Sequence, residues 1–391
     1  MYDFIGNKQT LSSMKIKQSR FKDEHELIHF LSHFNANEFD LHMVFTDIVY
    51  PTEPVISELF SRTFKDTLVV GCTTAGEIIN KRSEDKSFSI TSIKFEHTKV
   101  KKFTYSLQNT SDSFNAGKLL AKLLLADNLK HVFILSEGLH VNGTRLTEGF
   151  NAVLPPGVNV SGGLAGDNGK FENTLVIDQN NEFSPDCISV IGFYGDRLQS
   201  RTGSFGGWDS FGIDRIVTRS KENIVYEIDK QPALDLYKSY LGDMSQQLPG
   251  SALFFPLEMR MDAKSDVLVR TILGVNEADK SMTFAGNIPE GSSVRLMKTN
   301  VNRVIDGAEK AAEIANKDRI NAELVLMVSC VGRKLVLKQL VQDEIEAVVT
   351  EFPENTQFTG FYSYGELLKS GFSDNCELHN QTMTLTVLSE K

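Results

Sequence analysis

The sequence repeats one short pattern three times, and this repeat constrains the fold more than any other feature. Each copy is an extended apolar stretch, then a tight turn of small and hydroxyl-bearing residues, then a glycine and an acid. The copies occupy residues 68–77, 158–167 and 358–366. Three turns of one plan predict three related units, and we expect the turns to face a shared pocket.

Each turn follows a strand, an amphipathic helix and a second strand. Apolar periodicity places the strand, helix and strand of the first unit at 41–49, 53–64 and 67–71. Those of the second unit are at 131–136, 142–153 and 158–161, and those of the third unit are at 323–329, 335–352 and 357–360. Alternating apolar and polar residues after the turns predict hairpins on the same sheets. The sequence therefore predicts an α/β (α+β) fold of two related halves, with mixed β-sheets covered by helices and built from repeated strand–helix–strand units.

The length of 391 residues is two to three times the usual domain size of about 150 residues. The patterning changes near residue 230, where a hairpin is followed by a helix that opens at Gln231-Pro232. We therefore predict a loose N-terminal end over residues 1–22, a first domain over 23–229 and a second domain over 230–391.

Composition narrows the class of protein. Hydrophobic residues make up 41% and charged residues 24% of the chain, as in globular proteins, and the net charge is −10. An acidic chain without a basic stripe is not expected to bind nucleic acid. No apolar run reaches the roughly 18 to 20 residues of a membrane-spanning helix, and the N-terminus lacks a secretory signal. We therefore expect a cytoplasmic protein without membrane insertion.

The chemistry of the turns argues against a phosphate loop. The first turn lacks the Lys-Ser/Thr pair of a P-loop, and Glu77 would repel phosphate. Backbone N–H groups, hydroxyls and a carboxylate instead suit a small polar or zwitterionic ligand. The alternative is that glycine only permits a positive φ and that the acid caps nearby backbone. The candidate ligand-binding residues of the turns are Gly71, Cys72, Thr73, Thr74, Gly76, Glu77, Gly162, Gly163, Asp167, Tyr362, Ser363, Tyr364 and Glu366.

Two further residues near the turns could carry chemistry. Arg333 precedes the third helix and could clamp a carboxylate. Cys72 could act as a nucleophile, but no histidine lies next to it in the sequence, so a buried thiol is the preferred interpretation. The four cysteines form no C-x-x-C pair, and the sequence has no G-x-S-x-G elbow. We predict no catalytic residue and no enzyme activity.

Several ordered motifs resemble one family. Residues 71–77, 142–143 with 161–167, and 206–212 are similar to the N-terminal FIST domain. Residues 225–228 with 232–237, 329–333, 360–366 and 378–382 are similar to the C-terminal FIST domain. The resemblance covers about residues 40–388. One departure concerns the Gly-Trp turn, which usually continues with proline in the family but continues here with Asp209-Ser210.

The resemblance implies a sensory module that binds a small ligand and regulates a separate signalling partner. The chain resembles the stand-alone bacterial form, which includes the haem-containing, nitric-oxide-sensing NosP group. The implied function is a haem-based nitric oxide sensor that acts, as part of a two-component system, on a sensor histidine kinase or a cyclic-di-GMP enzyme. The alternatives are an amino-acid sensor without haem, a cysteine-dependent enzyme and an interaction scaffold. Homo-oligomerisation is left open.

Within the resemblance, residues 378–382 supply the candidates for cofactor binding. His379 is the expected axial haem ligand, and so the expected metal ligand, with a structural, hydrogen-bonded histidine as the alternative. His140 is the next candidate. Asn380 is the further residue that this motif adds to the ligand-binding set.

Overall fold

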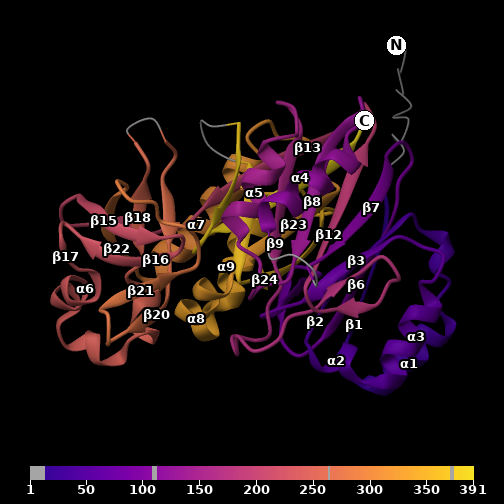
Figure 1. Ribbon diagram of the computed structural model, residues 1–391. Helices are drawn as coiled ribbons and strands as arrows, with labels where there is room; N and C mark the ends of the chain where they lie inside the picture. The colour runs from indigo at the N-terminus through magenta and orange to yellow at the C-terminus, as the bar shows by residue number, and fades with distance from the viewer. Residues whose placement is uncertain (1–13, 108–111, 263–264, 370–373) are drawn as a thin grey trace, which may run out of the picture.

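The computed structural model describes residues 14–107, 112–262, 265–369 and 374–391. These residues form a mixed α/β structure, which confirms the predicted fold class. A larger body of three sheets and their helices carries a smaller body on one side (Figure 1). Within the described residues, no helix combines the length and the apolar character needed to cross a membrane.

The larger body consists of three six-stranded sheets of one plan, as far as the described residues extend. The first sheet has the order β1 (Lys15–Phe21), β6 (Phe88–Lys94), β2 (Leu41–Thr46), β3 (Val69–Thr73), β10 (Val176–Ile177) and β11 (Phe183–Ser184). The second has the order β7 (Lys99–Ser106), β12 (Cys187–Tyr194), β8 (Leu129–Ser136), β9 (Asn159–Leu164), β25 (Gly365–Lys369) and β26 (Cys376–His379). The third has the order β13 (Leu198–Phe205), β27 (Met383–Glu390), β23 (Leu324–Cys330), β24 (Gln357–Ser363), β4 (Glu77–Ile79) and β5 (Arg82–Glu84).

Each sheet is centred on one pair of parallel strands, namely β2 with β3, β8 with β9, and β23 with β24. These are the strands of the three predicted strand–helix–strand units. The strand that follows each glycine turn then leaves its own sheet. β4 pairs with β24, β10 pairs with β3, and β25 pairs with β9, all antiparallel. Each unit therefore contributes one strand to the sheet of another unit: the first to the third, the second to the first and the third to the second. These shared strands join the three units into one body.

The helices cover the outer faces of the three sheets. They are α1 (Glu24–His33), α2 (Val49–Thr52) and α3 (Pro54–Thr63) on the first, α4 (Ser113–Leu124) and α5 (Gly143–Asn151) on the second, and α7 (Val301–Ala315), α8 (Val331–Leu337) and α9 (Val341–Val349) on the third. Four of them begin at an acid or amide cap whose side chain accepts from the N–H three residues later: Asp23, Asp112, Asn142 and Asn300. Such caps satisfy N–H groups that the helix leaves open, so the sequence fixes these starts locally.

Apolar side chains from all three sheets meet in the middle of the larger body. The parallel pairs place Val44 opposite Gly71, Ile134 opposite Gly162 and Met327 opposite Gly360, so these positions are equivalent in the three units. The next residues of β2, β8 and β23 point inward and belong to one buried cluster: Phe45, Leu135 and Val328. The repeat that is visible in the sequence is therefore a repeat of the central core.

The smaller body is inserted into the third unit, between β13 and α7. We call residues 209–298 the insertion domain. The nine strands found among its described residues follow the path β19 (Leu268–Arg270), β18 (Leu257–Arg260), β22 (Ser293–Lys298), β15 (Arg215–Lys221), β16 (Ile224–Ile228), β21 (Ser281–Phe284) and β20 (Ile272–Asn276), with β14 (Asp209–Ser210) beside β22 and β17 (Gln231–Pro232) beside β16. Together with α6 (Ala233–Leu241), it encloses an apolar core of its own. The predicted division between residues 229 and 230 falls inside this domain, between β16 and β17.

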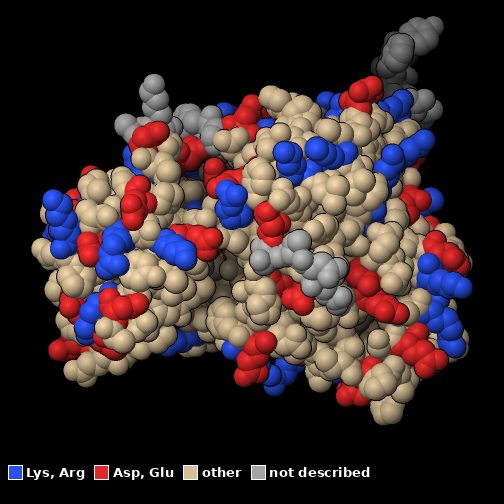
Figure 2. Space-filling view, in the orientation of Figure 1, with Lys and Arg blue, Asp and Glu red and all other residues tan. Residues whose placement is uncertain are grey.

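Charged side chains of both signs are spread over the surface of both bodies. Figure 2 shows basic and acidic groups interspersed across the visible face of the molecule, where neither sign forms a continuous stripe. This face therefore offers no extended basic track of the kind that neutralises nucleic-acid phosphates.

Candidate functional site

The structure brings the three predicted turns into direct contact with one another. Backbone hydrogen bonds of 2.8 to 3.1 Å join Ala75 to Tyr362, Tyr362 to Gly76, Gly166 to Thr73, and Tyr364 to Leu164. All three turns lie in the interior of the larger body, since the residues that form them are buried. The three turns therefore lie together, whereas the shared pocket that the sequence predicts stays a prediction.

Glu77 is fully buried and is hydrogen-bonded within its own unit. Its carboxylate accepts from the Thr74 hydroxyl at 2.6 Å, from the Ser87 hydroxyl at 2.7 Å and from the Ser87 N–H at 3.1 Å. Burial disfavours the charged form and raises the pKa of Glu77 to about 7, although these hydrogen bonds pull it down. The carboxylate ties the turn to the first residues of the returning strand.

Glu366 repeats this arrangement in the third unit. Its carboxylate accepts from the Ser363 hydroxyl at 2.8 Å, from the Thr382 hydroxyl at 2.9 Å and from the Thr382 N–H at 3.2 Å. Burial raises the pKa of Glu366 to about 8. Both turns thus share two features. The acid accepts from a hydroxyl three residues earlier in the chain, and it accepts from a hydroxyl residue that directly precedes the returning strand.

Asp167 closes the second turn in a different way. Its carboxylate accepts from the backbone N–H groups of residues 171, 172 and 173 at 2.8 to 2.9 Å and from the hydroxyl of Tyr364. The Tyr364 hydroxyl in turn accepts from the N–H of Asp167 at 3.2 Å. In all three units the acid therefore satisfies hydrogen-bond donors of its own turn or of neighbouring segments, which is the capping role that the sequence left open.

The glycines of the turns lie where strands approach closely. A Cβ on Gly71 would stand 2.1 Å from the carbonyl oxygen of Val44, and one on Gly162 would stand 1.9 Å from that of Ile134. A Cβ on Gly163 would stand 2.7 Å from the Val328 side chain. Gly76 has a φ of 135°, a conformation that favours glycine.

Cys72 and Thr73 are both buried at the end of β3. Cys72 is fully buried in the central core, and burial raises the pKa of its thiol well above the ordinary value. The Thr73 hydroxyl accepts from the Leu175 N–H at 3.0 Å. A thiol held in its protonated form among apolar side chains is a poor nucleophile.

Arg333 is fully buried in a network of its own. Its Nε donates to Glu344 Oε1 at 2.6 Å, its Nη2 donates to the Val304 carbonyl at 2.6 Å, and Glu344 also accepts from the Tyr362 hydroxyl at 2.8 Å. Nη1 of Arg333 donates to the Gly206 carbonyl. The guanidinium therefore joins α8, α9 and α7 to the loop that leads to the insertion domain.

A cleft of about 720 Å³ lies between the insertion domain and the larger body. Its lining residues are Gly157, Asn159, Thr202, Gly203, Ser204, Phe205, Gly206, Gly207, Ile314, Lys369, Asp374, His379 and Thr382 of the larger body and its linker, and Trp208, Ser210, Glu258, Asp266, Val267, Val269 and Met297 at or within the insertion domain. Of the predicted site residues, His379 lines this cleft. The turn carboxylates are not among its described lining residues.

Two polar atoms of the cleft lining are buried without a hydrogen-bond partner among the described residues: Trp208 Nε1 and Ser204 Oγ. Trp208 is only 8% exposed. A buried donor without a partner costs about 1 to 3 kcal/mol. Such atoms are expected where a bound molecule completes the hydrogen bonding.

The cleft also contains charges of both signs. Lys369 carries the positive charge, and its Nζ lies 3.4 Å from Asp374 Oδ1 and 3.5 Å from the Val158 carbonyl oxygen. Glu258 and Asp266 supply negative charge from the insertion domain. This distribution can orient a ligand that has both an anionic and a cationic end.

His379 is 7% exposed and lies at the end of β26. Burial and the neighbouring Arg270 lower the pKa of its imidazole to about 4, whereas a hydrogen bond with the Leu368 backbone acts in the opposite direction. The ring is therefore neutral at physiological pH. A neutral imidazole is the form in which a histidine ligates a metal, so His379 has the protonation state that the expected haem ligand requires. No group of three or more metal-binding side chains occurs within the described residues.

Asn380 lies beside His379 and joins the two bodies. Its Nδ2 donates to the carbonyl oxygen of Ala285 at 3.2 Å, and its Oδ1 lies 3.5 Å from the backbone nitrogen of Thr271. Asn380 is fully buried, so these contacts lie inside the interface between the two bodies.

Sequence reasoning did not select Trp208, Ser204 or Lys369 as site residues. One signal was available, because the only tryptophan of the chain lies in the glycine-rich segment 204–212. An aromatic side chain that folding places next to flexible glycines often marks an interface or a ligand site. Lys369 carried no such signal.

The profile of the FIST N domain matches residues 40–231, and that of the FIST C domain matches residues 233–369. The chain belongs to the FIST family. FIST domains are generally sensory, ligand-binding domains of signalling proteins. The border between the two FIST profiles lies within the insertion domain, directly before α6.

Two individual proteins are similar to this FIST protein. An uncharacterized protein of Methanocaldococcus jannaschii is 26% identical over 238 residues, which are 56% of this chain and 43% of that protein. The match thus spans less than half of the relative's length. A crystal structure of cyanuric acid hydrolase from A. caulinodans aligns over 97% of this chain and 99% of that one, with 8% identity and a TM-score of 0.34. A TM-score this low supports no inference about activity.

Proposed function

We propose that this chain is a sensory protein that binds its ligand in the cleft between the insertion domain and the larger body. The observation that supports this most directly is the pair of buried, unpaired polar atoms in the cleft, Trp208 Nε1 and Ser204 Oγ, which have no partner among the described residues. Their unmet hydrogen-bonding capacity costs free energy that a ligand with an acceptor group would recover. Their location between two bodies also suits a ligand that shifts the balance between conformations.

The charges of the cleft favour a small zwitterionic ligand such as an amino acid. Lys369 faces the ligand's carboxylate, together with the N–H of Trp208, while Glu258 and Asp266 of the insertion domain attract its ammonium group. A ligand that bridges the two bodies in this way binds best when they lie close together. It therefore stabilises the closed arrangement.

Trp208 provides its own test, because it is the only tryptophan in the chain. Amino acids that bind in the cleft are expected to change its fluorescence saturably during titration. Lys369→Met should weaken the response to an amino acid at least tenfold, whereas Lys310→Met, which removes an exposed helix lysine paired with Glu313, should leave it unchanged. A full panel of amino acids that leaves both Trp208 fluorescence and thermal stability unchanged would reject the amino-acid ligand.

A second candidate is a haem-based nitric oxide sensor, and the position of His379 in the same cleft favours it. The neutral imidazole would hold the iron, and Val267, Val269 and Met297 would offer apolar contacts to the porphyrin. Haem, when bound, supplies an iron centre that takes nitric oxide as a ligand. Haemin added to the protein should then give a Soret band that shifts with ferrous nitric oxide and should quench Trp208 fluorescence.

Two histidine variants separate specific from adventitious haem binding. His379→Ala should abolish the histidine-ligated spectrum, whereas His140→Ala should retain it, because the side chain of His140 is 73% exposed and lies outside the cleft. If the two variants give the same haem spectrum, His379 is not the haem ligand. No Soret band with the wild type would remove the haem sensor altogether.

The output of the sensor is proposed to be a contact with a separate protein, either a sensor histidine kinase or a cyclic-di-GMP enzyme, in the cytoplasm. Movement of the insertion domain against the larger body would alter the surface that such a partner meets. We propose no catalytic activity for the chain itself. Co-purification with and without ligand measures whether partner binding depends on occupancy, and mass measurement in solution determines whether the chain associates with itself.

A further inference from the structure

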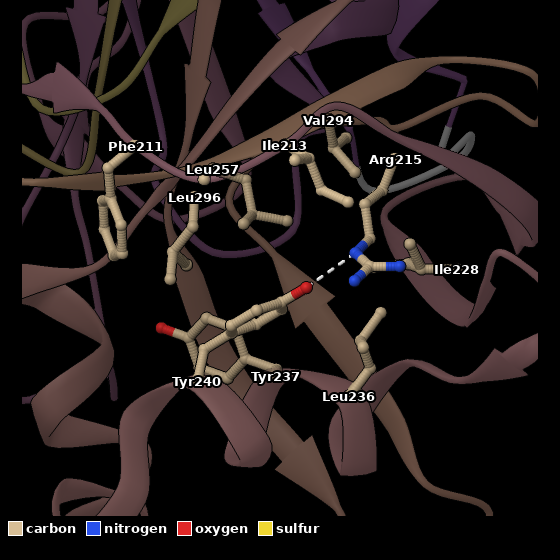
Figure 3. Close-up of a pocket in the computed structure, with 11 residues that line it drawn as sticks. Phe211, Ile213, Arg215, Ile228, Leu236, Tyr237, Tyr240, Leu257, Val294 and Leu296 are labelled. Carbon is tan, nitrogen blue, oxygen red and sulfur yellow. Dashed lines mark hydrogen bonds between the residues drawn. The ribbon is translucent and has the colours of Figure 1, made fainter.

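The insertion domain contains a second cavity, which is separate from the cleft. It has a volume of about 280 Å³ and lies between α6 and the strands β15, β16, β18 and β22. Its lining shares no residue with the lining of the cleft, as far as the described residues show. Figure 3 shows its side chains converging from the helix and from the sheet: Phe211, Ile213, Arg215, Ile228, Leu236, Tyr237, Tyr240, Leu257, Val294 and Leu296.

The walls of this cavity are apolar and its mouth is open to solvent. Leu257, Val294 and Leu296 are buried in the core of the insertion domain. At the mouth, Ile213 is 66% exposed and Tyr240 is 44% exposed. Exposed apolar side chains around a concave apolar site indicate an occupant that covers them.

One side of the cavity carries hydrogen-bond donors. Arg215 Nε donates to the Tyr240 hydroxyl at 2.6 Å (Figure 3), and Nη1 donates to Asp229 Oδ2 at 2.8 Å. The hydrogen bonds that the described residues show for Arg215 and Tyr240 involve Nε, Nη1 and the phenol oxygen as acceptor, so Arg215 Nη2 and the Tyr240 O–H proton can donate to a ligand. The Tyr237 hydroxyl donates to the Phe255 carbonyl at 2.8 Å and is therefore already engaged. A ligand that approaches Arg215 and Tyr240 must accept hydrogen bonds.

We infer that this cavity is a second ligand site, selective for a small aromatic or aliphatic molecule with one hydrogen-bond-accepting head group. The apolar body lies among the side chains of α6 and the sheet, and the head group meets Arg215 and Tyr240. At about 30 Å³ per water-sized group, 280 Å³ holds roughly nine or ten non-hydrogen atoms. This is the size of a monocyclic aromatic acid or amide, and it is too small for a folded protein segment.

Three probes with the same benzyl group test the head-group requirement by isothermal titration calorimetry. Phenylacetate and phenylacetamide both carry an acceptor and are expected to bind saturably at one site per chain. Phenethylamine carries a cation instead and is expected to bind at least tenfold more weakly, because it faces the Arg215 guanidinium. Equal affinity of all three probes would overturn the proposed head-group recognition.

Variants locate the site. Arg215→Met should weaken phenylacetate at least tenfold, whereas Arg219→Met on the same strand, which breaks an exposed pair with Glu227, should leave the affinity unchanged. Ile213→Asp alters only the exposed mouth and should also weaken phenylacetate. Because Ile213 is largely exposed, its variant is expected to fold normally, which keeps the test valid if Arg215→Met does not fold.

The result is independent of the proposed cleft function. Loss of phenylacetate binding in Ile213→Asp, together with unchanged phenylacetate binding in the cleft variant Lys369→Met, supports a site separate from the cleft. If none of the three probes binds to the wild-type protein at millimolar concentration, or if Ile213→Asp binds phenylacetate as tightly as wild type, the second site is rejected.

Discussion

Arg333 and Glu344 form a fully buried ion pair, with 2.6 Å between Nε and Oε1 and no exposed surface on either side chain. The Tyr362 hydroxyl donates to the same carboxylate, and the guanidinium also binds backbone carbonyls of α7 and of the Gly206 linker. A motif that sequence reasoning assigned to ligand binding thus connects the helices of the third unit to the entrance of the insertion domain.

Glu344→Ala should therefore lower the free energy of unfolding by about 3 to 5 kcal/mol, because it leaves a charged guanidinium buried without its partner. Urea denaturation measures the change. The control is Asp318→Ala, which breaks the exposed Arg201–Asp318 pair and should cost less than about 1 kcal/mol. An equally small effect of Glu344→Ala would show that the buried pair contributes little.

Three equivalent glycines give a second prediction. A Cβ at Gly71, Gly162 or Gly360 would come within 2.1, 1.9 or 1.8 Å of a carbonyl oxygen on the parallel neighbour strand. Each alanine substitution should therefore lower the free energy of unfolding by at least about 2 kcal/mol, since the strands must separate. Gly274→Ala, at a strand glycine with open space around it, should cost less than about 0.5 kcal/mol. Thermal or urea unfolding measures the four variants, and an effect of Gly274→Ala as large as that of the other three would contradict the steric role of the close strand approach.

The repeat was predictable because its signal is local. A glycine next to an acid, after an extended apolar stretch, depends on φ preferences and hydrogen bonds within a few residues. The exchange of strands was not predictable in this way. β4 pairs with β24, which is far away in the sequence, and no residue of β4 encodes that partner. Which sheet a short strand joins is decided by the packing of the whole body.

The candidate cleft was hidden for a related reason. Trp208 and His379 belong to segments that are distant in sequence, and the antiparallel pairing of β13 with β27, which ends at Phe205 opposite Met383, brings these segments to one cleft. Glu77 and Glu366 could be identified from their motifs. Their hydrogen bonds to Ser87 and Thr382 depend on strands that return after hairpins of different length, so the sequence left their role open between ligand contact and cap.

Glu77 gives a prediction for pH dependence. Burial raises its pKa from 4.5 to about 7, so the folded chain binds this proton more tightly than the unfolded chain. The stabilisation from this group is present below pH 4.5 and is lost as the pH rises through about 7. Glu77→Gln removes the effect, so the stability of the variant relative to wild type should rise between pH 5 and pH 8, by on the order of 3 kcal/mol.

Urea denaturation at several pH values measures this difference, with Glu58→Gln on an exposed face of α3 as control. A difference that stays constant with pH would contradict the buried, protonated carboxyl. If Glu77 acts as a cap, the ligand response per folded molecule should be the same in Glu77→Gln as in wild type. If Glu77→Gln is stably folded but no longer responds to ligand, Glu77 belongs to the ligand site.

The cysteines give a prediction that bears on catalysis. All four thiols are free and buried, and burial raises the pKa of each, to about 12 for Cys187 and well above the ordinary value for Cys72. Iodoacetamide at pH 7.5 should label the native protein no faster than global opening allows, and labelling should become fast in denaturant. Fast labelling of Cys72 in the native protein, identified by peptide mass analysis, would support the alternative that the protein is a cysteine-dependent enzyme.

Arg270 gives the last prediction, because it holds the insertion domain against the larger body. It is fully buried, its Nη1 donates to the Leu378 carbonyl at 2.9 Å, and burial lowers its pKa to about 10. Arg270→Gln should weaken the docking of the domain, and we expect faster hydrogen exchange on both sides of the interface, with the strands of the central core unchanged. Arg295→Gln, which breaks an exposed pair with Asp214 in the same domain, should leave exchange at the interface unaltered.

If the two variants show the same hydrogen exchange at the interface, Arg270 does not control docking of the insertion domain. If Arg270→Gln loosens the interface and weakens the Trp208 response to a cleft ligand by a similar free energy, docking and ligand binding are coupled as the proposed sensor requires.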